Sequence, residues 1–419
     1  MSAATSEFFD ALETRDPAVR EAALLAALPG QVAHAKGKTR AFAEILRDVE
    51  PSAIRTRADL ARLPVTRKQD LLERQQRERA QDPFGGFSAI GWGPFMPRVF
   101  ASPGTIYEPE GRARDYWRLA RAMFAAGFRS GELIHNCFSY HFVPAGSMME
   151  GGAHALGCSV FPGGTGQTEQ QIAAMAELKP AGYIGTPSFL KIIVEKAQAL
   201  GVPLPSVRKA LVGGEAFPPS LRDELRARGI EAYQCYVTAD LGTIAYETSA
   251  REGLVLDEGV IVEIVRPGGT EPVADGEVGE LVVTSLNPDY PLIRFGTGDL
   301  SAILPGLCPS GRTNARIKGW MGRADQTTKI RGMFVHAGQV ARAIQAFPQV
   351  RKARLVVSGP AASDRMVLKA EVADASPGLV AQLTAAVREV TRLRADIELV
   401  APGTLPNDGK VIEDARNYE

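Results

Sequence analysis

Between residues 99 and 215 the chain repeats one pattern, in which a short apolar run enters a turn rich in Gly or Pro and an amphipathic segment follows. Strands that alternate with helices form largely parallel sheets, and the loops at the strands' carboxyl ends then gather at one edge, where ligands bind. This alternation restricts the chain to an α/β fold. The apolar runs are ELIHNCF (132–138), CSVFPGG (158–164), AGYIGTPS (181–188) and VRKALVGGE (207–215), and we expect helices over 113–127, 145–156 and 167–178.

The apolar period changes to two after residue 254, in VIVEIV, GELVVTS and PLIRF, with the turn ADGEVG between the first two. This period predicts hairpin-like β structure. From residue 338 the pattern predicts a small two-layer α/β unit, with the order helix, strand, strand, helix, strand. The segment GWMGRADQTTKIRG joins the two parts and has the composition of a hinge.

We therefore predict an α/β protein of two domains. The large N-terminal α/β domain has mixed sheets and a β-rich subdomain, and the small C-terminal α/β domain is mobile. The predicted boundaries are 1–324 for the large domain, divided into a helical platform (1–90), an α/β core (91–253) and a β-rich part (254–324), and 325–419 for the small domain.

The charge balance argues against polymer partners. The chain has 48 basic and 48 acidic residues, so it offers no field that would attract nucleic acid or an anionic membrane. Its four cysteines lie far apart without a CxxC pair, which predicts neither a disulfide framework nor a zinc site. The acidic N-terminus does not look like a signal peptide, and we expect a cytoplasmic protein.

The stretch VFASPGTIYEPEGR (99–112) has the composition of a phosphate-binding loop. Ser102, Gly104 and Thr105 could offer backbone N–H groups and hydroxyls to a phosphate, because glycine permits close approach and the hydroxyls donate. An ordinary turn is the alternative. A lysine is expected in such a loop, and Glu108 stands in its place.

Several stretches follow one another in an order that resembles the acyl-adenylate-forming ligases, most closely their phenylacetate-CoA ligase branch. The resemblance covers nearly the whole chain, including RTRADLARLPVTRKQDL near the start. The stretches are ASPGT, LVGGEAFPPSLRDEL, QCYVTAD, PLIRFGTGDL with CPSGRT, GRADQTTKIRGMFV, and LPNDGK near the end.

The resemblance implies a role for residues on each of these stretches. Asp299 would accept hydrogen bonds from both ribose hydroxyls, and Tyr236 would stack on adenine; a helix cap and a buried core tyrosine are the respective alternatives. The turn that closes over adenine would contain Gly214, Glu215 and Ala216.

The resemblance also implies the catalytic groups. Lys410 would bring a cation from the small domain to the substrate carboxylate and the α-phosphate, Asp240 would hold Mg²⁺, and Arg323 would contact ribose or phosphate. Asp325 would be the hinge residue. An isolated lysine near a C-terminus is otherwise a solvated charge.

Three positions depart from the family pattern: Glu108 in place of the loop lysine, Tyr107 in place of a small residue, and VTAD (237–240) in place of glycine-x-serine/threonine-glutamate. We expect Asp240 to bind the metal as the usual glutamate does, since Mg²⁺ accepts either carboxylate. For the missing loop cation our hypothesis is a flanking arginine, Arg98 or, preferably, Arg112.

The segment NCFSYHFVPAGSMMEGGAHALG predicts an apolar slot, because small residues stand beside aromatic ones. Close packing of a Gly/Ala-rich helix on the sheet is the alternative. The matching region of the phenylacetate ligases lines the aryl pocket, which favours an aromatic or arylacetic acid, with His141 on a polar substituent. The predicted substrate-binding residues are Tyr140, His141, Phe142, Ala145 and Gly213.

The resemblance implies a two-step ligase that uses ATP, Mg²⁺ and CoA. The acid would form acyl-AMP, and CoA would then displace AMP to give a thioester. Transfer to a carrier protein or an amine, and a non-catalytic homologue that binds nucleotide or acyl-CoA, remain the alternatives. Family analogy suggests a homodimer, and the absence of a G-x-S-x-G elbow argues against a hydrolase.

Overall fold

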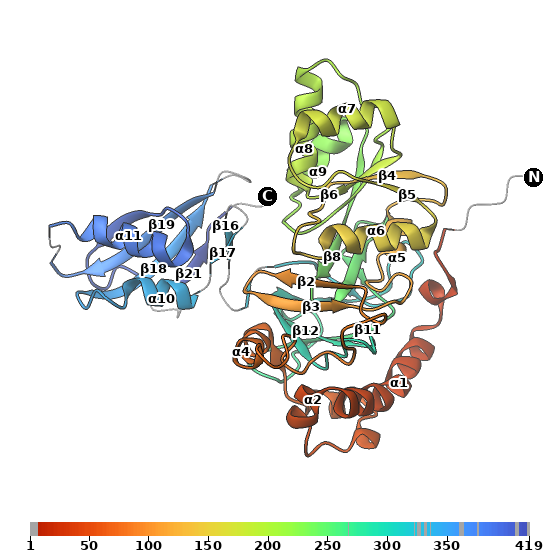
Figure 1. Cartoon of the computed structure of the whole chain (residues 1–419), viewed down its shortest axis with the longest axis horizontal. Helices are drawn as coiled ribbons and strands as arrows, with labels where there is room; N and C mark the ends of the chain where they lie inside the picture. The colour runs from red at the N-terminus through yellow and green to blue at the C-terminus, as the bar shows by residue number, and fades with distance from the viewer. Residues whose placement is uncertain are drawn as a thin grey trace, which may run out of the picture. The chain divides into compact units, whose positions relative to one another are not determined.

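The chain divides into two compact units, Met1–Gly322 and Arg323–Glu419 (Figure 1). The predicted division, after residue 324, lies close to this boundary. The computed structural model describes residues 7–266, 268–321, 323–324, 328–330, 333–335, 337–359, 364–374, 377–406 and 410–416. Within these residues no helix combines the length and the apolar character that crossing a bilayer requires.

A nine-stranded sheet forms the centre of the first unit, in the order β14-β15-β10-β9-β8-β7-β6-β4-β5. The strands from β5 to β8 are parallel, as the alternating pattern predicted, and the remaining strands are antiparallel. The parallel strands are β4 (Leu133–Asn136), β5 (Ser159–Pro162), β6 (Gly182–Gly185), β7 (Lys209–Val212) and β8 (Glu231–Thr238); the others are β9 (Gly242–Glu247), β10 (Leu254–Leu256), β14 (Ile303–Leu304) and β15 (Arg316–Ile317).

The helices between the parallel strands pack beside this sheet (Figure 1). The helix predicted over 145–156 is confirmed as α6 (Ala145–Leu156), and the helix predicted over 167–178 is confirmed as α7 (Thr168–Leu178). Helices α8 (Pro187–Ala199) and α9 (Pro219–Ala227) complete the series.

The helix predicted over 113–127 is mostly wrong, because only α5 (Ala120–Ala125) forms. Asp115 and Arg118 both have positive φ, which interrupts the helical path. The Asp115 carboxylate accepts hydrogen bonds from the backbone N–H groups of Leu119 and Ala120, at 2.7 and 2.9 Å, and so caps the shorter helix. Arg118 bonds instead to Asp257 at 2.7 Å. Side-chain hydrogen bonds therefore override the apolar period here.

A second sheet has the order β1-β13-β12-β11 and accounts for most of the predicted hairpin-like region. Its strands are β1 (Thr66–Arg67), β11 (Val260–Val265), β12 (Gly279–Ser285) and β13 (Phe295–Ser301). A two-stranded hairpin, β2 (Arg98–Ser102) and β3 (Ile106–Glu110), lies beside the helix α4 (Lys68–Glu78).

The N-terminal platform is helical, as predicted, and shares one hydrophobic core with β11, β12 and β13. Arg294 also joins the platform to the second sheet. It is fully buried, pairs with Glu263 of β11 at 3.0 Å, and donates to the carbonyl oxygen of Ala61 in the platform at 2.8 Å. Breaking such a buried pair is costly because it leaves an unpaired charge. The helices are η1 (Ala11–Thr14), α1 (Pro17–Lys38), α2 (Arg40–Ile45), η2 (Pro51–Ala53), α3 (Arg57–Ala61) and α4 (Lys68–Glu78).

The second unit contains the helices and strands predicted for it. Its sheet has the order β20-β19-β18-β21, and α10 and α11 contribute to a separate hydrophobic core. The elements are β16 (Thr328–Ile330), β17 (Met333–Val335), α10 (Ala337–Ile344), β18 (Val350–Ser358), β19 (Arg365–Val372), α11 (Leu379–Thr391), β20 (Asp396–Val400) and β21 (Ile412–Asp414).

Candidate active site

The loop at the carboxyl end of β7 carries the predicted adenine turn. Gly214 has φ +78°, a backbone conformation that glycine adopts without strain. A Cβ atom on Gly213 would lie 3.1 Å from the carbonyl oxygen of Cys235, so this position also favours glycine. Glu215 accepts a hydrogen bond from the backbone N–H of Ser188, at 2.7 Å, and thereby ties the turn to the first residues of α8. Ala216 is half-buried in the same turn.

Tyr236 and Asp299, predicted from separate motifs, meet in the structure. The Tyr236 hydroxyl donates to Oδ2 of Asp299 at 2.6 Å, a contact that joins β8 of the large sheet to β13 of the second sheet. The indole Nε1 of Trp320 donates to the other carboxylate oxygen at 3.0 Å. Sequence reasoning missed Trp320, although it stands in the segment read as a hinge. Both donors help to orient the buried Asp299 carboxylate.

The β2–β3 hairpin shows where Glu108 points. The backbone N–H of Ser102 donates to its Oε2 at 3.2 Å, and the Ser102 hydroxyl donates to Oε1 at 2.5 Å. Both side chains are buried. The expectation that Ser102 offers its donors to a phosphate is therefore wrong for this conformation, because the Glu108 carboxylate accepts both. Gly104 and Thr105 are exposed at the turn.

Glu108 shares its surroundings with Asp240 and Lys68. Burial, together with the negative charge of Asp240, raises the pKa of Glu108 to about 8, while Lys68 and the Ser102 hydrogen bonds act in the opposite direction. Lys68, the first residue of α4, donates from Nζ to Oδ2 of Asp240 at 2.8 Å. The Lys68 side chain is 30% exposed, whereas that of Asp240 is 1% exposed.

Lys68 is thus the cation beside the two carboxylates, and sequence reasoning did not identify it. It lies in VTRKQDL, within a stretch that carried the family resemblance but received no functional role. The position of Lys68 beside Asp240, the carboxylate predicted to bind the metal, could be recognised only once the fold was known, because 172 positions separate the two residues.

The donor set around Asp240 suits a magnesium ion. Its Oδ1 is buried and has no hydrogen-bond partner among the described residues, and the same holds for the hydroxyl of Tyr290. Carboxylate oxygens are preferred Mg²⁺ ligands. No group of three or more His, Cys, Asp or Glu side chains in the described ranges could hold a metal. A metal bound here would need phosphate oxygens and water to complete its coordination.

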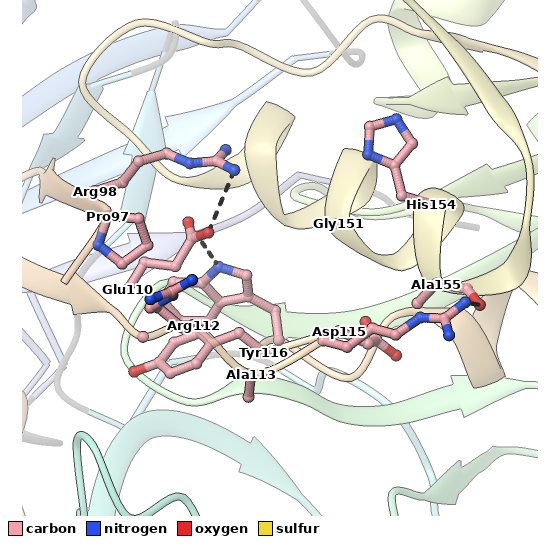
Figure 2. Close-up of a pocket in the computed structure, with 13 residues that line it drawn as sticks. Pro97, Arg98, Glu110, Arg112, Ala113, Asp115, Tyr116, Gly151, His154 and Ala155 are labelled. Atoms are coloured by element: carbon pink, nitrogen blue, oxygen red, sulfur yellow. Dashed lines mark hydrogen bonds and ion pairs between the residues drawn. The ribbon is translucent and has the colours of Figure 1, made fainter. Parts of the chain in front are cut away.

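The hypothesis that Arg112 or Arg98 replaces the loop lysine is wrong, because both lie at the other end of the hairpin. Arg98 is paired in register with Glu110, and Ser102 with Ile106, so roughly 13 Å of strand separates the arginine from the turn. Figure 2 shows Arg98 and Arg112 in a separate cavity of about 330 Å³. There Arg98 pairs with Glu110 at 3.5 Å.

The predicted acyl-binding region is only partly assembled in the first unit. Tyr140 accepts a hydrogen bond from the Asn136 amide at 2.8 Å and donates to Glu150 at 2.9 Å, and burial raises its pKa. A Cβ atom on Gly146 would meet the Tyr140 ring at 2.8 Å, so the small residue permits the ring to pack on α6.

The neighbouring residues differ in exposure. Ala145 is half-buried at the start of α6, and Gly213 is buried at the end of β7. His141 is exposed, and Phe142 is 81% exposed with φ +61°. The expectation that Phe142 forms a pocket wall is therefore wrong within the first unit, where its position in the loop directs it to the surface.

The remaining predicted catalytic residues belong to the second unit. Lys410 is exposed and lies two residues before β21, and Arg323 is half-buried at the start of the unit. The predicted hinge residue Asp325 lies outside the described residues. The meeting of Lys410 with the groups of the first unit thus stays a prediction.

Comparison with known proteins identifies the family. Residues 114–287 match the family model described as AMP-binding enzyme. The phenylacetate-coenzyme A ligase of Thermus thermophilus is 31% identical over 342 residues, which are 78% of this chain and 75% of that protein. The corresponding Escherichia coli enzyme is 31% identical over 402 residues, 88% of each chain. This chain belongs to the phenylacetate-CoA ligase family.

Membership makes it an AMP-forming acid–CoA ligase, which activates a carboxylic acid as acyl-AMP and then forms the CoA thioester. Solved structures agree on the fold. A 2-hydroxyisobutyryl-CoA ligase in complex with its acyl-AMP and CoA superposes with a TM-score of 0.82 at 24% identity, covering 100% of this chain and 94% of that one. An amide bond synthetase from Marinactinospora thermotolerans reaches a TM-score of 0.53 at 19% identity, with 77% and 71% covered.

Proposed function

We propose that this ligase activates an aromatic or arylacetic acid, with ATP, Mg²⁺ and CoA as its co-substrates and cofactor. The observation that carries the proposal is the contact between Tyr236 and Asp299, which assembles an aromatic ring and an oriented carboxylate at one place. An aromatic face can stack on adenine, and a carboxylate can accept hydrogen bonds from both ribose hydroxyls. The relatives named as phenylacetate-coenzyme A ligases support the class of acid.

The phosphates of ATP would extend from this adenosine site toward Lys68 and Asp240. Gly104 and Thr105, exposed at the hairpin turn, can approach the phosphates closely. Lys68 would supply the positive charge that the loop lacks, since its long side chain is 30% exposed and already places its ammonium beside Asp240. Asp240 would hold Mg²⁺, which would neutralise phosphate charge when bound.

The first half-reaction is an in-line displacement at the α-phosphorus. A carboxylate oxygen of the acid forms the new P–O bond, and the bond to pyrophosphate breaks. Lys410, delivered by the second unit, offsets the negative charge that develops on the α-phosphate and the carboxylate. Removing one such preorganised donor costs about 10²- to 10³-fold in rate. Arg323 would contact the ribose or a phosphate.

In the second half-reaction the thiol sulfur of CoA attacks the acyl carbon, and the bond to AMP breaks. The second unit would rotate about Asp325 between the two steps, withdrawing Lys410 and admitting the thiol. Such gating by a domain movement commonly controls turnover.

The acyl group would lie near Tyr140, whose hydroxyl is fixed between Asn136 and Glu150. The Tyr140 ring packs on Gly146 and can offer its remaining apolar surface to the acyl group, with Ala145 and Gly213 as the other small residues predicted to line the pocket. His141 would meet a polar substituent on the ring of the acid.

Pyrophosphate–ATP exchange with a panel of acids tests this proposal. We expect exchange with arylacetic or benzoic acids and little with short aliphatic acids of equal concentration. Efficient exchange with aliphatic acids alone would refute the class of acid. Complete absence of exchange, with nucleotide still bound in calorimetry, would favour a non-catalytic homologue. Product analysis after adding CoA or an amine identifies the acceptor.

A further inference from the structure

A lysine ammonium stands in this chain at the place where a metal would meet the carboxylates. Nζ of Lys68 lies 2.8 Å from Oδ2 of Asp240, and Glu108 is close enough for its charge to interact with both groups. Oδ1 of Asp240 is buried without a hydrogen-bond partner among the described residues, as is the nearby hydroxyl of Tyr290. The cluster therefore holds oxygen atoms whose coordinating capacity is not used.

We propose that Glu108 and Asp240 form a two-carboxylate site for a divalent cation, and that the ammonium of Lys68 occupies this site in the free enzyme. The metal ion then binds only as the Lys68 ammonium leaves Asp240, so that one cation replaces the other. The inference deepens the proposed function, on which it rests, because it makes Glu108 a second metal ligand and Lys68 an internal competitor of the metal.

The balance of charge supports an exchange of cations. Two buried carboxyl groups share one ammonium, so a divalent ion would compensate the charge of both in their ionised form more completely than Lys68 does. Holding the metal ion and the Lys68 ammonium in the site together would be costly, since two positive charges a few ångströms apart repel strongly in a poorly solvated environment. The cation that leaves must have somewhere to go. Lys68 is partly exposed on a flexible stem, and the phosphates of ATP offer it a new partner.

The anchoring of the carboxylates supports the same assignment. Glu108 is held by the backbone N–H and the hydroxyl of Ser102, yet each carboxylate oxygen has a second lone pair for another contact. Asp240 lies in the turn between β8 and β9. If the Lys68–Asp240 ion pair were only structural, it would need neither the second carboxyl group of Glu108 beside it nor a buried Oδ1 of Asp240 without a hydrogen-bond partner.

The experiment measures binding of Mn²⁺ to the free protein by electron paramagnetic resonance, with no ATP, acid or CoA present. Lys68→Met removes the competing cation, so we expect Mn²⁺ to bind about tenfold more tightly than to the wild type, after allowance for partial solvent screening. Adding Glu108→Gln to Lys68→Met should reverse most of that gain. Mg²⁺ should displace the bound Mn²⁺ from the wild type and from Lys68→Met.

Glu110→Gln is the matched control, because Glu110 lies on the same strand two residues further and is also buried. It should leave Mn²⁺ affinity unchanged. If Lys68→Met binds Mn²⁺ no more tightly than the wild type, the exchange is refuted. If Lys68→Met and the double variant bind equally, Glu108 is not a ligand. If circular dichroism shows that Lys68→Met is unfolded, Lys68→Gln, which also lacks the positive charge, takes its place in the experiment.

Failure of this inference is separable from failure of the proposed function. Mn²⁺ binding uses no substrate, whereas pyrophosphate exchange by the wild type requires the whole reaction centre. Normal exchange with unchanged Mn²⁺ affinity in Lys68→Met overturns only the cation exchange.

Discussion

Replacing Tyr236 by phenylalanine isolates the contact that joins the adenine and ribose residues. The substitution keeps the ring that would stack on adenine and removes only the hydroxyl, which donates to Asp299 at 2.6 Å. Trp320 would continue to donate to the other carboxylate oxygen. The carboxylate would then lose one of the side-chain donors that orient it.

A hydrogen bond to a charged group contributes about 1.5–3 kcal/mol. If most of this free energy serves to orient Asp299 for the ribose, Tyr236→Phe should raise the KM for ATP by roughly 10- to 100-fold. The rate at saturating ATP should change much less, because the hydroxyl does not meet the reacting atoms. Pyrophosphate exchange at varied ATP concentration gives both values, and calorimetry with the free enzyme measures ATP affinity directly.

Tyr233→Phe is the control, since Tyr233 lies on the same strand and faces Arg251 instead, with its ring 4.7 Å from the guanidinium carbon. It should leave the KM for ATP unchanged. Equal KM values for the two variants would refute the idea that the Tyr236 hydroxyl prepares Asp299 for nucleotide.

Three further predictions concern catalysis, proton linkage and packing. Lys410→Ala should lower acyl-AMP formation about 10²- to 10³-fold and spare thioester formation from preformed acyl-AMP; equal loss in both assays would contradict its role. Burial raises the pKa of Asp115 from 3.8 to about 6, so the folded state retains this proton to higher pH, and the associated stability, present below pH 3.8, is lost as the pH rises through about 6. Relative to Asp115→Asn, the wild type should lose up to about 3 kcal/mol of unfolding free energy over that range, and parallel urea-denaturation curves would disprove the linkage. Gly152→Ala should destabilise by about 1–3 kcal/mol, because its Cβ would lie 2.4 Å from Cβ of Leu119, whereas Gly151→Ala in the same helix meets nothing within 4 Å and should not lower the melting temperature.

The periodic parts of the chain could be predicted from sequence because their signal is local. The apolar runs that became β4 to β7, the helices α6 and α7, and the order of elements in the second unit all follow from spacing along the chain. The positions of Tyr236 and Asp299 in recognisable motifs were likewise visible, and they supported the family assignment before any contact between them was known.

Contacts between distant segments were decided only by the tertiary structure. The helix expected over 113–127 was shortened by Asp115 and Arg118, whose hydrogen-bond partners include groups far along the chain. Glu108 looked like a defect of a phosphate loop, yet it turns inward to Ser102 and faces Asp240 and Lys68. No periodicity predicts that an ammonium will meet a carboxylate 172 positions away, since such a meeting depends on how the sheets and helices pack.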